Sequence, residues 1–299
     1  VGAYAIIRVH TIVFGPDIPA TGDMAGLWLF AAAIVTVGIG AFGVLGARRL
    51  MPLIAFSVLG SMGTLMLAIS AFTPGATTAA LYYLVHSTFA AAALFLIADL
   101  VVTRRPGDTL TTLPATVQNG LFAALFFGAA IGMAGMPPLS GFLGKLFVLD
   151  NLRDPAEIGW AWTAILVGSL FTIVGFARAG SALFWKSTAF VLPENVISDD
   201  EEKEEVPITR DPAKAWEVAP TMAAIGMLAA LSIFAGPAAR YFELTADQLF
   251  DRNAYVSAVL ENPDGLKPYP DDHHGEEDAA YDEDAAGHDD DGSAKDGGH

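Results

Sequence analysis

The 299-residue chain contains no cysteine, and only 16 of its residues are lysine or arginine. The missing cysteines exclude a disulfide framework, a thiolate nucleophile and any metal site with cysteine ligands. The few basic residues form no patch of the kind that binds nucleic acid. We therefore expect no bound metal, no cofactor and no nucleic-acid partner.

Acidic charge is confined to two stretches of the chain. Residues 263–299 contain thirteen acidic residues and two lysines, and the run DDEEKEE at 199–205 adds a charge of −5 to a net charge of −17. The remainder is nearly neutral, with a mean hydropathy of +0.46 for the whole chain, which is more apolar than is usual for a soluble protein. The composition indicates a membrane protein with two solvated acidic segments.

Six long apolar segments and a shorter N-terminal stub approach the roughly 20 residues that cross a bilayer. They are apolar on nearly all sides, which argues against a soluble bundle. The sequence predicts an all-α, polytopic membrane helix bundle of about seven transmembrane helices or part-helices, one of them broken at Pro137 and Pro138. The predicted segments are residues 2–14, 24–46, 50–72, 77–102, 119–149, 158–184 and 216–241.

Lysine and arginine are concentrated in alternate connections between these segments. The opposite connections have no basic residue at 15–23 and 73–76, and only Arg153 within 150–157. Basic loops face the cytoplasm in membrane proteins, so the C-terminal tail is predicted to lie on the outer face of the cell membrane. The basic connections carry Arg48, Arg49, Arg104, Arg105, Lys186, Lys203, Arg210 and Lys214.

The C-terminal region divides into two further parts beyond a transmembrane domain at 1–242. Residues 243–262 alternate apolar and polar side chains at helical spacing, which predicts an amphipathic helix on a membrane or partner surface. A short solvated helix packed on the same protein is the alternative. Residues 263–299 predict a disordered acidic tail. This tail holds four of the six histidines, so a metal-binding tail is the alternative to a merely solvated one.

Ionisable side chains inside the apolar segments are candidate functional residues, because placing one at the bilayer centre costs at least ~2.5–3.5 kcal/mol. Lys145 lies in the stretch GMPPLSGFLGKLFVLD, which begins at Gly135, and His86 lies near the middle of its segment. Asp99 and Arg178 lie closer to the basic ends of their segments. For these two residues an interfacial position is the alternative to a role in a proton relay.

The break before Lys145 suggests what this lysine does. Pro137 and Pro138 cannot donate backbone hydrogen bonds, and irregular backbone is tolerated at membrane depth only where protein or a water-filled cavity surrounds it. With glycines such as Gly141 nearby, Lys145 can be hydrated when charged and partly desolvated when neutral, so it can take up and release a proton. The alternative is that Lys145 reaches the outer surface with its amine.

His86 is the second candidate on a proton path. Imidazole titrates near neutral pH and can pass a proton through either ring nitrogen. Tyr82, one helical turn earlier, and Ser87, beside it, are further candidate relay groups. The alternative is that His86 makes an interhelical hydrogen bond that holds the bundle together.

These motifs resemble the antiporter-like membrane subunits shared by respiratory complex I and Mrp-type cation/proton antiporters. The stretch GMPPLSGFLGKLFVL resembles the broken-helix motif of that family, RRLMPLIAFSVLGSMGTLMLAI resembles its KRLLAYSSISHMG segment, and ALYYLVHSTFAAAALFLIADLV resembles its histidine-containing helix. The C-terminal stretch FAGPAARYFELTADQLFDRNAYVSAVL is most similar to the D subunit of multisubunit Mrp-type Na⁺/H⁺ antiporters. The resemblance covers residues 1 to about 260 in order.

The resemblance implies the second half of a 14-helix subunit. VGAYAIIRVHTIVF resembles the sequence after the family's central-helix lysine, so the glutamate–lysine pair of the first half-channel is expected before Val1. Lys145 matches the lysine that ends the second proton path, and His86 lies in the helix that supplies a relay residue. This sequence departs from the family at Ala91, where relatives carry a lysine, and at Ser61, where many carry a histidine. The relay would then depend on water, His86 and hydroxyl groups.

The resemblance leaves three functions to compare. The favoured one is a proton-translocating subunit that works with other subunits, in contact with membrane lipid, to exchange Na⁺ for H⁺. The second is an antiporter-like proton-pumping subunit of an NADH:quinone oxidoreductase or a membrane-bound hydrogenase, with the redox cofactors on other subunits. The third is a structural subunit that carries no ions. The first and third are not enzymes.

Overall fold

The computed structural model describes residues 2–13, 24–105, 107–113, 115–154, 157–186, 212–251 and 257. Within these ranges the structure is helical, apart from connections and one isolated β-bridge between Arg49 and Thr109. It agrees with the predicted all-α class. The elements are α1 (Gly2–Val13), α2 (Met24–Gly46), α3 (Leu50–Ser70), α4 (Pro74–Val102), α5 (Asn119–Ala134), α6 (Ser140–Asn151), α7 (Ile158–Gly180), the π-helix η1 (Ser181–Trp185), α9 (Ala215–Ile233) and α10 (Ala235–Phe250).

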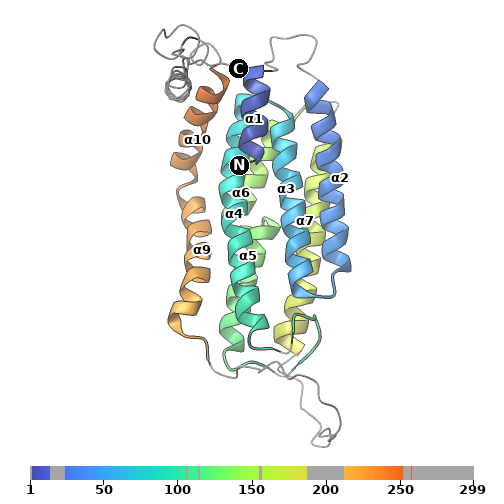
Figure 1. The fold of residues 1–299 in the computed structure, drawn as a ribbon, viewed down its shortest axis with the longest axis vertical. Helices are drawn as coiled ribbons and strands as arrows, with labels where there is room; N and C mark the ends of the chain where they lie inside the picture. Colours follow the sequence, from blue (N-terminus) through green and yellow to red (C-terminus); the bar gives the residue numbers. More distant parts are fainter. Residues whose placement is uncertain are drawn as a thin grey trace, which may run out of the picture. The chain divides into compact units, whose positions relative to one another are not determined.

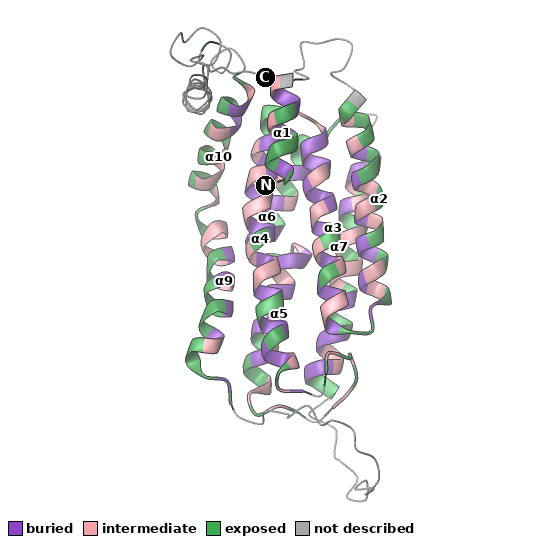
Figure 2. Ribbon diagram, in the orientation of Figure 1, coloured by how far each residue is buried: buried purple, intermediate pink, exposed green. Residues whose placement is uncertain are grey.

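Five helices of the described ranges are long and apolar enough to cross a membrane, namely α2, α3, α4, α7 with η1, and α9. They belong to a helical unit that ends at Phe250 (Figure 1). The helices α2, α7 and α9 have many exposed positions along their length (Figure 2). Large apolar residues occupy some of these positions, among them Trp28, Leu170 and Trp216. Such faces suit contact with lipid or with a neighbouring subunit.

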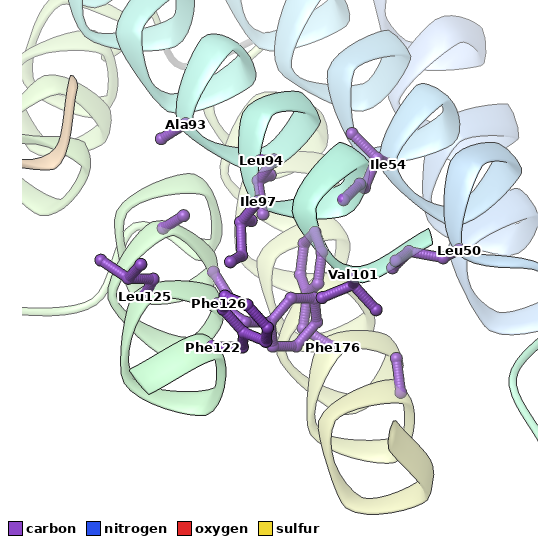
Figure 3. Close-up of a cluster of buried hydrophobic side chains, with 14 of the residues drawn as sticks. Leu50, Ile54, Ala93, Leu94, Ile97, Val101, Phe122, Leu125, Phe126 and Phe176 are labelled. Carbon is purple, nitrogen blue, oxygen red and sulfur yellow. The ribbon is translucent and has the colours of Figure 1, made fainter. Parts of the chain in front are cut away.

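The core of the unit is built where α3, α4, α5 and α7 meet. Leu50, Ile97 and Phe122 have no exposed surface there, and Phe176 of α7 packs against Phe126 (Figure 3). These side chains come from α3, α4, α5 and α7, so their packing holds α4 and α5 in place relative to each other.

The predicted break at Pro137 and Pro138 is confirmed. α5 ends at Ala134 because Gly135 takes a left-handed conformation with φ of 80°. The N–H groups of Gly135 and Met136 both bond back to the carbonyl of Ile131, which closes the helix end. The prolines cannot continue the helix, and α6 begins at Ser140.

The predicted single segment at 216–241 is wrong. α9 ends at Ile233, Phe234 leaves the helical conformation, and α10 runs from Ala235 to Phe250. Pro237 explains the interruption, because it lacks the N–H that would bond to the carbonyl of Ile233 and is tolerated only in the first turn of a new helix. α9 and α10 lie end to end beside α4 (Figure 1).

The predicted division between residues 242 and 243 falls inside α10, so the amphipathic segment does not begin a helix of its own. Whether 243–262 lies on a membrane or partner surface stays a prediction. Beyond Asp251, only Ser257 of that segment is described. The tail at 263–299 and the acidic run at 199–205 also lie outside the described residues.

The basic connections converge at one end of the bundle. The loop after α4 bonds to the loop after α2 through Leu110 N–H to Arg48 O at 2.9 Å, and Arg49 forms an ion pair with Asp108. Arg104, at the end of α4, forms an ion pair with Glu217 at the start of α9. The connections that are rich in lysine and arginine in the sequence therefore contact one another or their neighbours in the structure.

Candidate functional site

The Lys145 side chain turns back toward the end of the helix that precedes it. Its Nζ donates to the carbonyl oxygen of Ala134 at 2.8 Å and lies 3.5 Å from that of Met133. It also donates to Ser169 Oγ on α7 at 2.8 Å. The last carbonyls of a helix carry partial negative charge and favour a cation, so the broken end of α5 is a receptor for the protonated amine.

Glycine is required at position 135 for this contact. A Cβ on Gly135 would lie 2.7 Å from Lys145 Cδ and 3.0 Å from its Nζ. The same residue needs its positive φ to end α5. The alternative in which the Lys145 amine reaches the membrane surface does not match this geometry, because Ala134 and Ser169 hold it inside the bundle.

Lys145 also borders a small cavity between α2, α3, α4 and α7, which we call the hydroxyl cavity. Its volume is about 20 Å³ in the space open to the centre of a water molecule. Val37, Ala41, Met133 and Ile165 supply its apolar walls. Its polar lining consists of Lys145 and the hydroxyl groups of Ser57, Ser61, Thr64, Tyr83, Ser169 and Thr172.

His86 lies at the other side of the break, against the start of α6. Its Nδ1 is 2.9 Å from Ser140 Oγ, and the side chain has no exposed surface. Its Nε2 has no hydrogen-bond partner among the described residues. A Cβ on Gly141 would lie 2.9 Å from this nitrogen, so the close approach of α4 and α6 depends on the glycine.

The structure brings His86, Lys145, Ser61, Gly141 and the proline break together. Ser61 joins the site through the hydroxyl cavity, where its Oγ lies 3.1 Å from Tyr83 Oη. The break between α5 and α6 thus has a contact on each side. His86 of α4 lies against Ser140 at the start of α6, and the amine of Lys145 lies against Ala134 at the end of α5.

Three other candidates lie apart from this group. Ser87 donates to Leu84 O of its own helix. Asp99 is exposed near the end of α4. Arg178 donates to the carbonyl of Ala47 at 2.6 Å and so caps the end of α2. Their geometry matches the interfacial or structural alternatives.

The hydroxyl of Tyr82 is directed toward the C-terminal end of α9, just before the interruption between α9 and α10. Its hydroxyl donates to Leu231 O at 3.0 Å, and its ring lies edge-on to Phe147 with centroids 5.1 Å apart. Close by, Ser232 Oγ donates to Pro138 O at 2.7 Å. The interruption of α9–α10 is therefore bonded directly to the break of α5–α6.

Replacing Tyr82 with phenylalanine is expected to lower the free energy of unfolding by about 1 kcal/mol, because the Leu231 carbonyl loses its donor. Cation-driven proton exchange by the intact assembled protein should keep its pH profile. Thermal denaturation of the purified protein and exchange assays in vesicles measure the two effects. Loss of exchange with unchanged stability would place Tyr82 on the relay instead.

Ser140, Tyr83 and Ser169 are members of the site that the sequence did not single out. The sequence offered a clue to Ser140, because it is the first residue of α6 after the proline break and has a side chain that can form hydrogen bonds. Tyr83 is adjacent to Tyr82 and differs from it only in the helix face it occupies. Ser169 had a weaker signal, as a hydroxyl in the middle of an apolar segment.

Comparison with known proteins assigns the chain to a family. Residues 1–172 match the family described as NADH:quinone oxidoreductase/Mrp antiporter, TM. The chain is 31% identical over 294 residues to the D subunit of a probable K⁺/H⁺ antiporter of Rhizobium meliloti, covering 88% of this chain and 51% of that protein. It is 28% identical over 263 residues to the D subunit of a Na⁺/H⁺ antiporter of Bacillus subtilis, covering 87% and 49%.

The chain thus spans about half the length of the curated relatives it matches. Among solved structures, a chain of the Mrp complex from Dietzia sp. superimposes with a TM-score of 0.69 and 25% identity, over 86% of this chain and 52% of that one. The apolar helices and these matches agree on a multi-pass membrane protein. The chain belongs to the NADH:quinone oxidoreductase/Mrp antiporter transmembrane family.

Proposed function

We propose that this chain is part of a proton-translocating subunit of a multisubunit monovalent cation/proton antiporter. The observation that carries the proposal is the bond from Lys145 Nζ to the terminal carbonyl of a broken helix, inside an apolar bundle. Within the described ranges, Lys145 is the cationic group that the break itself positions. The names of the two relatives described above, subunits of K⁺/H⁺ and Na⁺/H⁺ antiporters, support this reading.

The geometry suggests how Lys145 alternates between two states. When protonated, the amine is stabilised by Ala134 O, by Ser169 Oγ and by the partial negative charge at the end of α5. When neutral, it no longer carries the cost of a charge among apolar walls. A proton arriving at His86, across the α5–α6 break from the Lys145 amine, would add positive charge and favour release from Lys145, because like charges repel.

Na⁺ is the exchanged cation that we propose, with K⁺ as the competing candidate from the name of the first relative. We further propose that the protein lies in the cell membrane with the basic connections in the cytoplasm and the C-terminal tail outside. Other subunits of an antiporter complex and membrane lipid would cover the exposed apolar faces of α2, α7 and α9.

A deletion and complementation experiment tests the proposed function. Everted vesicles from cells that lack their own antiporters and carry the complete gene cluster should lose a respiration-driven pH gradient on addition of NaCl or KCl. Choline chloride should have no effect. Vesicles from cells without the gene for this subunit should not respond, and the intact gene on a plasmid should restore the response.

Exchange at the wild-type rate without this subunit, in a complex that still assembles, would contradict the proposal and favour a structural subunit. A pH gradient that forms on addition of a quinone reductant, but does not respond to either cation, would favour the proton-pumping subunit of an oxidoreductase.

A further inference from the structure

Three of the hydroxyl groups on residues that line the hydroxyl cavity donate their proton elsewhere and are left to accept hydrogen bonds. Ser57 donates its proton to Ile54 O at 2.7 Å, Thr172 to Gly168 O at 2.8 Å and Ser169 to Ile165 O at 2.7 Å. Each of these hydroxyls uses its one donor on its own helix and can only accept further hydrogen bonds, and Ser169 already accepts one from Lys145. The cavity is therefore suited to a guest that donates hydrogen bonds.

Lys145 supplies the matching charge. A protonated amine has three N–H donors, and two of them are used at 2.8 Å by Ala134 O and Ser169 Oγ. The next acceptor, Met133 O, lies at 3.5 Å, the limit of a hydrogen bond. The third donor is thus poorly satisfied by protein atoms, and Lys145 itself forms part of the cavity wall.

The size of the cavity fits one water molecule. A water needs roughly 10–15 Å³ of such space together with two to four polar partners. The hydroxyl cavity offers about 20 Å³ and seven polar side chains, Lys145 among them. A water here would accept from Lys145 and donate to two hydroxyl oxygens, so the third donor of the amine would gain a partner.

We propose that the hydroxyl cavity holds one ordered water that hydrates protonated Lys145, so that Ser169 and Thr172 are positioning residues that set how firmly Lys145 holds its proton. The inference rests on the proposed function, because it gives the titrating lysine its solvent. The ionisable groups that face Lys145 from the packed helices are Tyr83 and His86 of α4; among the described residues, the cavity walls on α2, α3, α5 and α7 contribute none.

The test uses the intact protein in its complex and measures the pH profile of Na⁺-driven proton exchange in vesicles. Ser169→Ala removes a direct acceptor of the Lys145 ammonium, so half-maximal exchange should move about one pH unit toward acid. Ser169→Thr restores the hydroxyl and should restore the profile. Thr172→Val removes one cavity acceptor with little change in volume and should give a smaller shift in the same direction.

Thr36→Val is the matched control, because Thr36 on α2 also donates to its own helix, to Ala32 O at 2.7 Å, but lies outside the cavity. Its profile should equal that of the wild type. An experimental map of the complex at high resolution should show density for one water between Lys145 Nζ and the cavity hydroxyls.

An unshifted profile in Ser169→Ala and Thr172→Val, or a lower rate without any shift, would overturn the inference, as would a cavity filled by protein atoms in that map. These outcomes are distinct from failure of the proposed function. That failure appears as wild-type exchange by a complex without Lys145, whatever happens at Ser169.

Discussion

Replacing Lys145 with alanine in the intact protein should abolish cation-driven proton exchange, with the rate falling by at least about 100-fold, the range expected when a proton-transferring group is removed. The loss follows from the position of the amine, which is held between Ala134 O and Ser169 Oγ. Lys145→Arg should fail as well, because a guanidinium keeps the positive charge but does not release its proton in proteins. The measurement is collapse of a pH gradient in everted vesicles after addition of NaCl.

Lys186→Ala is the control for this experiment, since Lys186 is exposed at the basic end of the bundle. It should exchange at the wild-type rate. Co-purification of the other subunits with each variant shows that the complex is assembled. Normal exchange by the assembled Lys145→Ala complex would refute the role of this lysine, and normal exchange by Lys145→Arg would show that charge alone is needed.

Replacing Gly141 with alanine should prevent normal packing of α6. The added Cβ would overlap the carbonyl oxygen of Gly132 and approach His86 Nε2 to 2.9 Å. Backbone of α5 and a buried ring cannot both move aside, so we expect a loss of about 3 kcal/mol in the free energy of unfolding, at the upper end of overpacking costs. A lowered melting temperature and a reduced yield of assembled complex are the measurements.

Gly226→Ala is the matched control, because no atom lies within 4 Å of the added Cβ on α9. Alanine inside a helix is favoured over glycine by roughly 0.5–1 kcal/mol, so this variant should be as stable as the wild type or slightly more so. Equal stability of the two variants would show that α4, α5 and α6 do not pack as described.

The break and its lysine could be predicted from the sequence because their causes are local. Pro137 and Pro138 remove donors wherever they occur, and an ionisable residue in an apolar segment is conspicuous without knowledge of its neighbours. The division of 216–241 into α9 and α10 also has a local cause at Gly236 and Pro237. Hydropathy misses it, since Pro237 removes a backbone donor and Gly236 weakens the helix without either residue making the segment polar.

The partners of Lys145 and His86 are determined by packing between helices far apart in the chain. Ser169 meets Lys145 only because α7 lies against the end of α5, and Ser140 meets His86 only because Gly141 lets α6 approach α4. No spacing along the chain encodes either contact. Spacing could not tell where the hydroxyls of Tyr82 and Ser87 are directed, and the structure bonds them to Leu231 O and Leu84 O. Asp99 and Arg178 were already placed near the basic ends of their segments by the sequence.

The bonds at the interruption between α9 and α10 have a mechanical consequence. Ser232 holds the carbonyl of Pro138, two residues before α6 begins, while Tyr82 of the histidine-bearing helix holds Leu231. Leu231 and Ser232 are neighbours in the last turn of α9, so this one turn is tied both to α4 and to the segment that leads into the lysine-bearing helix. A displacement of the C-terminal end of α9 would therefore strain both hydrogen bonds together.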